Sequence, residues 1–337
     1  MEFFGFTLFS SLAKGQLLLV ASVIFIVGLI LTIKGGDWFV DSASWFAEAT
    51  GIPKFVVGAT IVSFATTLPE LLVSVRAATN GSAQLAIGNA VGSVTANTAL
   101  IMGISIIAIA GVVNRKNFAF KGVLFISAVV ALTLLSLSGT LPVWSATILW
   151  AIFITFMVSS VIEGKKGAET DIVTKFEKKE IPAKIAMFVL GTACIIFGAE
   201  FLVSSGKTLA LGLGISETIV GFIVIAIGTS LPELITTITA IRKKEGSLSV
   251  GNIIGANVID TTLILPLCAV INGKSLPVER INLNFTFPVA IAVALVAIIP
   301  TIIQGRFKKW QGFVLLGIYA IYLVLIVLGE FGVVALG

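Results

Sequence analysis

Long uncharged apolar runs recur from one end of the chain to the other, and they limit the possible folds more than any other feature. The clearest are 17–33, 122–141, 143–162 and 312–328, each close to the ~20 residues that a helix needs to cross a bilayer. Hydrophobic residues make up 57% of the chain and charged residues only 12%, a balance unsuited to a soluble domain. The chain is therefore expected to be an integral membrane protein with one polytopic domain.

Ten spans account for the whole hydropathy pattern. The first lacks the charged start and the small-residue cleavage site of a signal peptide, so we expect it to be a membrane span. The expected spans lie near 15–40, 54–79, 84–110, 120–141, 143–162, 184–206, 217–241, 248–271, 283–303 and 310–333.

The basic residues predict the orientation of these spans. When successive loops are placed alternately on the two sides, 17 of the 22 basic residues fall on one side and 5 on the other. Lys and Arg accumulate in cytoplasmic loops. We therefore expect a multi-pass protein of the cell membrane with both termini extracellular and the 163–183 loop cytoplasmic.

The absence of histidine from the sequence restricts the available chemistry. Histidine is the commonest proton shuttle and transition-metal ligand, so cation chemistry here must use carboxylates and neutral oxygens. The contrasting class is a membrane enzyme, but a serine-histidine protease dyad is impossible and the Gly-x-Gly-Asp signature of intramembrane aspartyl proteases is missing. We expect no enzymatic activity, no cofactor and no nucleic-acid partner.

The chain repeats itself at an offset of 163 residues. Without a gap, 58–102 aligns with 221–265, and 14 of the 45 positions are identical, including Gly, Pro, Asn and Glu. Each repeat contains five spans, an odd number, so the second must enter the membrane from the opposite face.

The expected domains are a first repeat (1–162), a cytoplasmic linker (163–183) and a second, inverted repeat (184–337). Inverted repeats with broken helices around a midplane site are typical of secondary transporters. We expect an all-α fold with helices 2, 3, 7 and 8 broken around a cation site.

Each repeat carries a Leu-Pro-Glu motif within the membrane. The intervals from Ser63, Thr66 and Thr67 to Glu70 place these oxygens on one helical face, and Thr229, Ser230 and Glu233 repeat the pattern, with Ala226 in place of the serine. An ionised Glu in the bilayer costs at least about 2.5 kcal/mol, and a bound cation would offset that cost.

The proline of each motif has no N–H, so the carbonyls of Ala65 and Gly228 are expected to lose their helical partners and to become hard oxygen ligands.

A second polar stripe follows in the third and eighth spans. Asn89, Ser93 and Asn97 recur every four residues, and Asn252, Ala256 and Asp260 occupy the same places in the second repeat. Asp260 adds a third carboxylate at membrane depth, which favours cation binding over a purely structural hydrogen bond for Asn97 and Asp260. The spacing of Gly88 with Gly92, and of Gly251 with Gly255, allows helices to approach closely.

The two motifs also carry a family resemblance. GATIVSFATTLPE at 58–70 and GFIVIAIGTSLPE at 221–233 resemble the α-1 and α-2 repeats of the sodium/calcium exchanger family, within the calcium/cation antiporter superfamily, and the chain is similar to its prokaryotic members. Residues 88–97 and 251–260 complete the two repeats. The resemblance implies a secondary active antiporter that exchanges sodium for calcium by alternating access. Calcium and sodium ions and the lipid bilayer are the implied partners; the oligomeric state stays open, and a monomer is sufficient.

The resemblance also implies roles for individual residues. Glu70 and Glu233 would be the shared central acids, and Thr66 and Thr229 would add hydroxyl or carbonyl oxygens. Flanking sodium sites would be lined by Thr67, Ser230, Ser63, Ser93 and the carbonyl of Ala226. Asn97 and Asp260 would form the other central polar pair.

Departures from the family pattern leave the driving ion open. Ala256 stands where the family usually has a serine, which removes one hydroxyl from a flanking sodium site. The alternative is a proton-coupled or potassium-dependent exchanger: Asp260 matches the acid of potassium-dependent relatives, whereas the Gly-Asn-x-x-Glu of proton/calcium relatives is missing. A channel is a further alternative, but a doubled acidic cage predicts tight binding and slow turnover.

Overall fold

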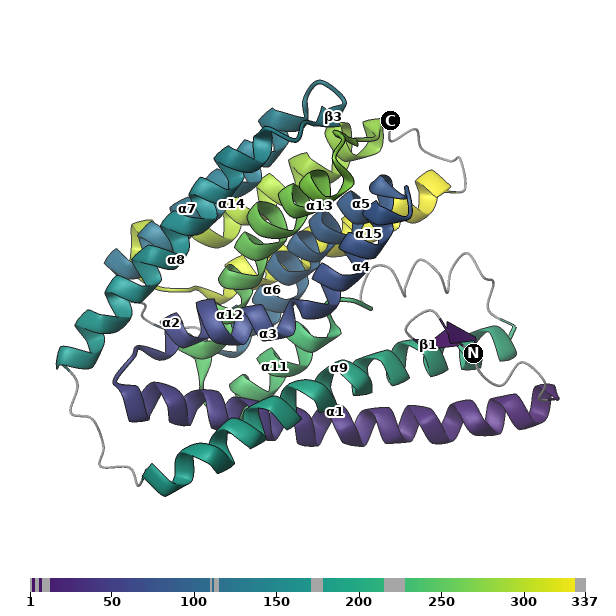
Figure 1. The fold of residues 1–337 in the computed structure, drawn as a ribbon, viewed down its shortest axis with the longest axis horizontal. Coiled ribbons are helices and arrows are strands. Elements are labelled where there is room, and N and C mark those ends of the chain that lie inside the picture. The colour runs from purple at the N-terminus through teal and green to yellow at the C-terminus, as the bar shows by residue number, and fades with distance from the viewer. Residues whose placement is uncertain are drawn as a thin grey trace.

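The fold is a bundle of long helices (Figure 1). The computed structural model describes residues 2–3, 6–7, 13–109, 111, 115–170, 178–214 and 228–330. Within these ranges eight helices are long and apolar enough to cross a membrane, or nine if a helix pair bent by 46° counts as one span. The expected seventh span begins in 215–227, outside the described residues.

The elements follow the hydropathy pattern, although α1 runs to Thr50 and α8 to Thr170, beyond the expected ends of their spans. The α-helices are α1 (Lys14–Thr50), α2 (Lys54–Val57), α3 (Ser63–Thr66), α4 (Leu68–Thr79), α5 (Ala83–Thr95), α6 (Met102–Ala108), α7 (Arg115–Ser136), α8 (Ser145–Thr170), α9 (Ile181–Gly212), α11 (Leu231–Arg242), α12 (Gly246–Ile259), α13 (Leu265–Asn272), α14 (Phe287–Gln304) and α15 (Lys309–Glu330). Shorter elements are the π-helical segments η1 (Gly58–Val62), η2 (Ala96–Ile101), η4 (Asp260–Ile264) and η5 (Asn282–Thr286), the 3₁₀ turn η3 (Lys178–Glu180), and the strands β1 (Glu2–Phe3), β2 (Phe6–Thr7), β3 (Thr140–Leu141) and β4 (Leu276–Pro277).

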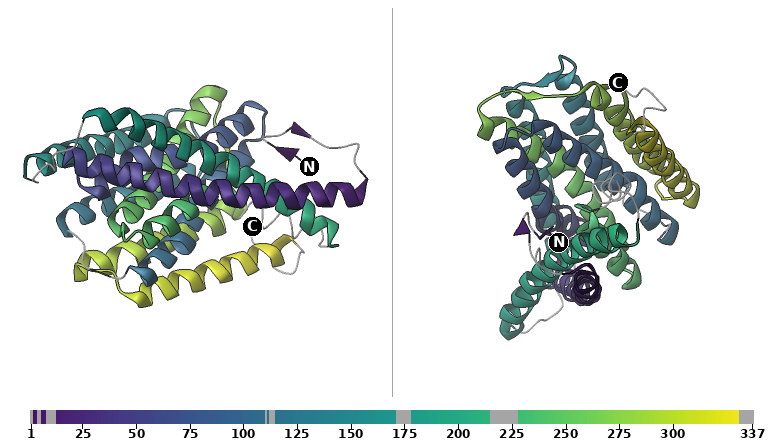
Figure 2. Two further views of the ribbon diagram at one scale, coloured as in Figure 1. Left: turned by 90° about the horizontal axis from the view of Figure 1, so that it is seen from below. Right: turned by 90° about the vertical axis from the view of Figure 1, so that its right-hand side faces the viewer.

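Two long helices, α1 and α9, lie side by side along one face of the bundle (Figures 1 and 2). They contain 37 and 32 residues, which correspond to lengths of about 55 and 48 Å. Both exceed the ~30 Å thickness of the hydrocarbon layer, so these helices must tilt or extend beyond it.

Glycines hold α1 against α9. A Cβ atom added at Gly28 would lie 2.9 Å from the carbonyl oxygen of Gly198, and one at Gly35 would lie 2.9 Å from that of Gly191. The residue numbers rise along one helix as they fall along the other, so the two helices run antiparallel. The 163-residue offset relates Gly28 to Gly191 and Gly35 to Gly198. The four glycines at the crossing therefore form two offset-related pairs.

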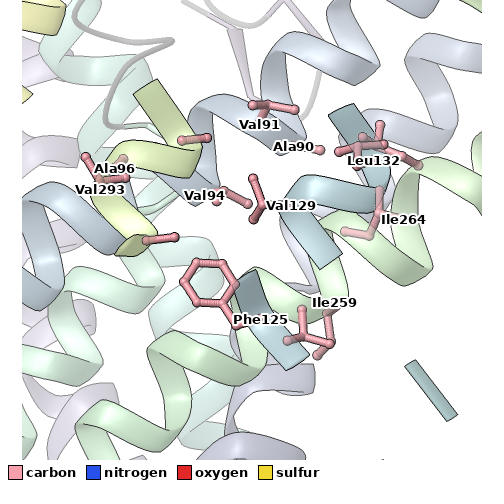
Figure 3. Packing of buried hydrophobic residues seen from close by; sticks show 14 of the residues in the cluster. Ala90, Val91, Val94, Ala96, Phe125, Val129, Leu132, Ile259, Ile264 and Val293 are labelled. Atoms are coloured by element: carbon pink, nitrogen blue, oxygen red, sulfur yellow. The ribbon is translucent and has the colours of Figure 1, made fainter. Parts of the chain in front are cut away.

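The remaining helices form a central bundle around an apolar core. Val94 of α5, Phe125 and Val129 of α7, and Ile259 of α12 meet there, with Val293 of α14 beside them (Figure 3). Helices α5 and α12 are the most enclosed of the spans, which is why their polar stripes lie inside protein rather than against lipid.

Short backbone contacts tie the two halves of the chain together within the bundle. Strand β3 pairs with β4, and the Val278 amide donates to the Gly139 carbonyl at 2.9 Å. A further bond joins the halves through the Phe307 amide and the Gly111 carbonyl, at 3.0 Å. The bundle is thus cross-linked by pairings between connecting segments.

A charge cluster joins α1 to the turn between α11 and α12. Lys243 Nζ lies 2.7 Å from Asp41 and 3.6 Å from Asp37. Glu245 accepts hydrogen bonds from Ser44 at 2.8 Å and from Lys54 at 2.7 Å. The α1–α9 pair is therefore attached to the bundle by polar contacts as well as by packing.

The helices next to the expected site deviate from regular α-geometry in two ways. The second span bends by 46° at Thr67, as predicted. The expected breaks in the third and eighth spans are wrong, because 83–108 and 246–272 each continue as one helix. Each contains a π-helical segment, η2 or η4, where the helical hydrogen bonding widens. Pro266 follows η4 by two residues, yet the helix continues through it.

Candidate cation site

Two matching helix interruptions position the Leu-Pro-Glu acids. Thr67 precedes α4 with φ −85° and ψ 2°, and Ser230 precedes α11 with φ −85° and ψ 7°. A proline follows within the first two residues of each helix, and Glu70 and Glu233 lie in the first turns. The positive end of the helix dipole therefore faces each carboxylate, which favours negative charge at these two places.

Glycines bring α12 close to the bent second span. A Cβ atom at Gly58 would lie 2.3 Å from the Leu248 carbonyl oxygen, and one at Gly255 would lie 2.4 Å from both the Ala59 carbonyl and the Ser63 hydroxyl. The predicted close approach is confirmed for α12. For Gly88 and Gly92 of α5, no described atom comes within 4 Å of such a Cβ.

Three carboxylates lie inside this packed region. Glu70, Glu233 and Asp260 are all fully buried. Both oxygens of Glu70, both of Asp260 and one of Glu233 have no hydrogen-bond partner among the described residues. Glu233 and Asp260 also repel the Glu70 carboxylate electrostatically. Five buried, unpartnered carboxylate oxygens constitute an environment that a cation would stabilise.

Neutral oxygens of the two repeats meet around these acids. The Thr67 hydroxyl donates to Glu233 Oε1 at 3.4 Å, which joins the break in one repeat to the acid of the other. Ser93 of α5 lies 3.3 Å from the Thr229 hydroxyl, again across the repeats. Hydroxyl groups of this kind are ligands for hard cations.

The other predicted residues lie in the same region. Ser63 is fully buried, and its hydroxyl donates to the Thr60 carbonyl at 3.0 Å. Asn97 and Ser230 are almost fully buried, and the side-chain oxygen of Asn97 has no partner among the described residues. Asn97 is in η2 and Asp260 begins η4, so each π-helical segment holds a predicted polar residue. Ala226 lies outside the described residues.

Two amides belong to the site although their roles were not predicted. Thr66 donates to Asn252 Oδ1 at 3.2 Å. Asn89 donates to the Ser74 hydroxyl at 3.0 Å and to the backbone carbonyl of Glu70 at 3.4 Å. Both positions hold asparagine at the 163-residue offset, and this shared residue type was the signal that could have placed Asn89 and Asn252 in the site.

The carbonyls of Ala65 and Gly228 were expected to lose their helical partners, and for Gly228 this expectation is only partly correct. The Gly228 carbonyl still accepts a long 3.5 Å bond from the Leu231 amide, because the chain tightens at the break and brings that N–H within reach. The oxygen is therefore only weakly engaged.

The composition of the site determines what it can bind. In the part of the chain that the structure describes, no three Asp, Glu, His or Cys side chains gather closely enough to hold a metal ion by themselves. A cation here would need hydroxyl, amide or backbone oxygens beside the carboxylates. An all-oxygen set of this kind suits calcium or sodium rather than soft metals.

Comparison with known proteins identifies the family. The model of the sodium/calcium exchanger protein family matches residues 20–162 and 183–328. The chain belongs to the sodium/calcium exchanger family. The sodium/calcium exchanger MaX1 of Methanosarcina acetivorans is 30% identical over an alignment of 345 positions that covers 90% of this chain and 97% of MaX1. The inner membrane protein YrbG of Escherichia coli is 35% identical over 268 residues, which cover 75% of this chain and 81% of YrbG.

Solved structures of the sodium-calcium exchanger NCX_Mj share the fold of this exchanger-family chain. One of them, soaked with Na⁺ and Sr²⁺, superposes with a TM-score of 0.80 at 28% identity and covers 91% of this chain and 98% of the solved one. These structures describe extracellular ion exchange and occlusion of the binding site. The expected all-helical exchanger fold is thereby confirmed.

Proposed function

We propose that this chain is a secondary active antiporter that exchanges sodium for calcium across the cell membrane. The observation that carries the proposal is the set of five buried carboxylate oxygens on Glu70, Glu233 and Asp260 that have no hydrogen-bond partner in the described part of the chain. Family membership, the fold of NCX_Mj and the likeness to MaX1 support the choice of ions. We propose transport and not catalysis, with no cofactor.

The proposal includes ten spans arranged as two inverted repeats. The matching dihedral angles at Thr67 and Ser230, the matching ends of α4 and α11 at the 163-residue offset, and the antiparallel α1–α9 pair support it. The excess of basic residues on one side supports extracellular termini and a cytoplasmic 163–183 loop.

Exchange follows from competition for one set of oxygens. Calcium binds between Glu70 and Glu233 with oxygens of Thr66 and Thr229, Asn97 and Asp260 form the other central polar pair, and sodium ions use the same acids. The flanking sodium sites add Thr67, Ser230, Ser63, Ser93 and the carbonyl of Ala226. Both cargoes need the same carboxylates, so they exclude each other. An empty site leaves uncompensated buried charge, which disfavours a return without cargo.

Calcium-45 uptake into sodium-loaded vesicles tests the proposal. Uptake should require an outward sodium gradient and fall more than about tenfold in Glu70→Gln and Glu233→Gln, because a buried cation then loses a charge partner worth several kcal/mol. Glu48→Gln is the matched control, since that side chain is 56% exposed. Uptake that ignores sodium, or that survives both Gln substitutions, contradicts the proposal.

Potassium and proton coupling are tested in the same vesicles. Asp260, an acid where the first repeat has Asn97, favours a test for potassium. Potassium-dependent exchange predicts uptake that requires potassium in addition to sodium and that loses this requirement in Asp260→Asn. Uptake driven by a pH gradient alone would instead identify a proton-coupled exchanger.

A further inference from the structure

We infer that the groove between the bent second span and α9 is a phospholipid site, with one acyl chain inside it and the phosphate group beside Lys184. The groove is a cavity of about 930 Å³. One wall is formed by residues of η1, α3 and α4, and the other by α9, with Met157 of α8 between them.

The chemistry of the walls fits a hydrocarbon chain. Thr60 and Thr192 are the hydroxyl-bearing residues of the lining. The Thr60 hydroxyl donates to the Val56 carbonyl at 2.7 Å, and that of Thr192 donates to the Phe188 carbonyl at 2.8 Å. Each hydroxyl is thus used within its own helix, so the groove offers an apolar surface. It opens through large exposed apolar residues, including Leu72 at 68%, and at membrane depth such residues face lipid tails.

The α9 wall continues into a polar anchor. Its lining residues recur in pairs four residues apart, so they form one stripe: Phe188, Val189, Thr192, Ala193, Ile196 and Phe197. One turn earlier the same stripe continues with Lys184 and Ile185, about 6 Å further along the axis.

The Lys184 ammonium lies 6.0 Å from the centre of the Trp45 ring, near the start of α9. A tryptophan and a lysine beside the end of a membrane helix are typical of the lipid headgroup level. Lys184 thus supplies a positive charge that complements a lipid phosphate, which selects a phospholipid over a neutral detergent tail.

A lipid tail in the groove would pack against the bent segment that also carries residues of the cation site. Phe64, Ala65 and Leu68 line it, and they flank Thr66 and Thr67 along the chain, whose hydroxyls bond Asn252 and Glu233 respectively. A bound tail fills the space between the bent segment and α9. The site does not depend on which ions are exchanged, so it is tested by binding alone.

Native mass spectrometry of the purified chain with added phosphatidylglycerol tests the site. We expect one tightly retained phospholipid per chain. Ala193→Phe fills the groove and should abolish retention, and Lys184→Gln should reduce it several-fold. Leu190→Phe is the matched control, because Leu190 is 55% exposed on α9 but does not line the groove. Equal retention in Ala193→Phe and Leu190→Phe, or retention of detergent alone, overturns the inference.

A second measurement does not depend on how Ala193→Phe folds. Tryptophan is placed inside the groove by Val189→Trp and outside it by Leu190→Trp, at positions of similar exposure, 59% and 55%. After washing with excess detergent, a phospholipid with brominated acyl chains should quench only the added fluorescence of Val189→Trp. Equal quenching of the two variants contradicts a retained tail.

Discussion

At the scale of single residues, the two repeats differ in one hydroxyl near the buried acids: Ser93 in the first corresponds to Ala256 in the second. Ser93 lies 3.3 Å from Thr229, and the same offset pairs Ala256 with Thr66. Ala256 is fully buried, so water cannot replace the missing hydroxyl without rearrangement. In the proposed exchanger, this difference removes one hydroxyl from a flanking sodium site.

Ala256→Ser is expected to strengthen sodium binding. One added hydroxyl contributes about 1 kcal/mol, which corresponds to a roughly fivefold lower sodium concentration for half-maximal calcium release. Ser93→Ala should shift that concentration the opposite way. The measurement is sodium-dependent calcium-45 release from vesicles, and an unchanged sodium dependence in both variants would exclude these positions from the sodium sites.

The Asn89 amide is expected to matter for stability. Asn89→Ala leaves the buried Ser74 hydroxyl and the Glu70 carbonyl without its N–H bonds, a loss of about 1–3 kcal/mol. Thermal unfolding in detergent should therefore begin a few degrees lower. The control is Asn80→Ala, at the exposed end of α4. Equal unfolding temperatures would show that these bonds do not stabilise the fold.

The residues of the site differed in how well sequence could place them. Glu70 and Glu233 were predictable because helical spacing and the repeat offset agree on them. Outside the site, Lys121 was counted with the loop charges, but it is buried in α7, and its ammonium donates to the Phe156 carbonyl at 3.1 Å and to Ser159 at 2.7 Å. A long side chain finds such partners on a neighbouring helix, which hydropathy along one segment does not reveal.

At the scale of helices, the α1–α9 crossing should be the least tolerant of added volume. In Gly191→Ala the new methyl group would lie 2.8 Å from the Phe39 amide nitrogen, so the helices must separate. Gly206→Ala on the same helix meets only a ring atom at 3.7 Å, which is ordinary contact. We expect lower thermal stability and slower exchange in Gly191→Ala but not in Gly206→Ala. Equal behaviour of the two variants would argue against a tight crossing.

Helix breaks were predictable where a specific residue causes them. Pro69 and Pro232 marked the interruptions at Thr67 and Ser230. The π-helical segment at Asn97 has no such residue, and the one at Asp260 is followed by Pro266 without a break, because packing between helices accommodates the extra residue in a turn. Their expected breaks were wrong for that reason.

At the scale of the whole molecule, the fold was largely predictable because the same pattern occurs twice. Long apolar runs fixed most of the spans, and the gapless offset related the two halves. The pairing of β3 with β4 and the bond from Phe307 to Gly111 could not be predicted, since two-residue contacts between loops leave no periodic signal.

The charge cluster on α1 has a consequence for the energetics of the cycle. The offset relates Lys243 and Glu245 to Asn80 and Ser82, and Asp41 to Ser204, so the repeats do not reproduce it. Partly exposed pairs contribute about 0.2–1 kcal/mol each. If α1 leaves these partners during the cycle, the two access states differ in free energy by a similar amount.

Apparent calcium affinities measured in right-side-out and inside-out vesicles should therefore differ several-fold and converge in Lys243→Gln. Equal affinities on both faces of the unmodified protein would contradict this. A few surface charges then bias the resting molecule toward one access state, whereas the ion gradients set the direction of net exchange.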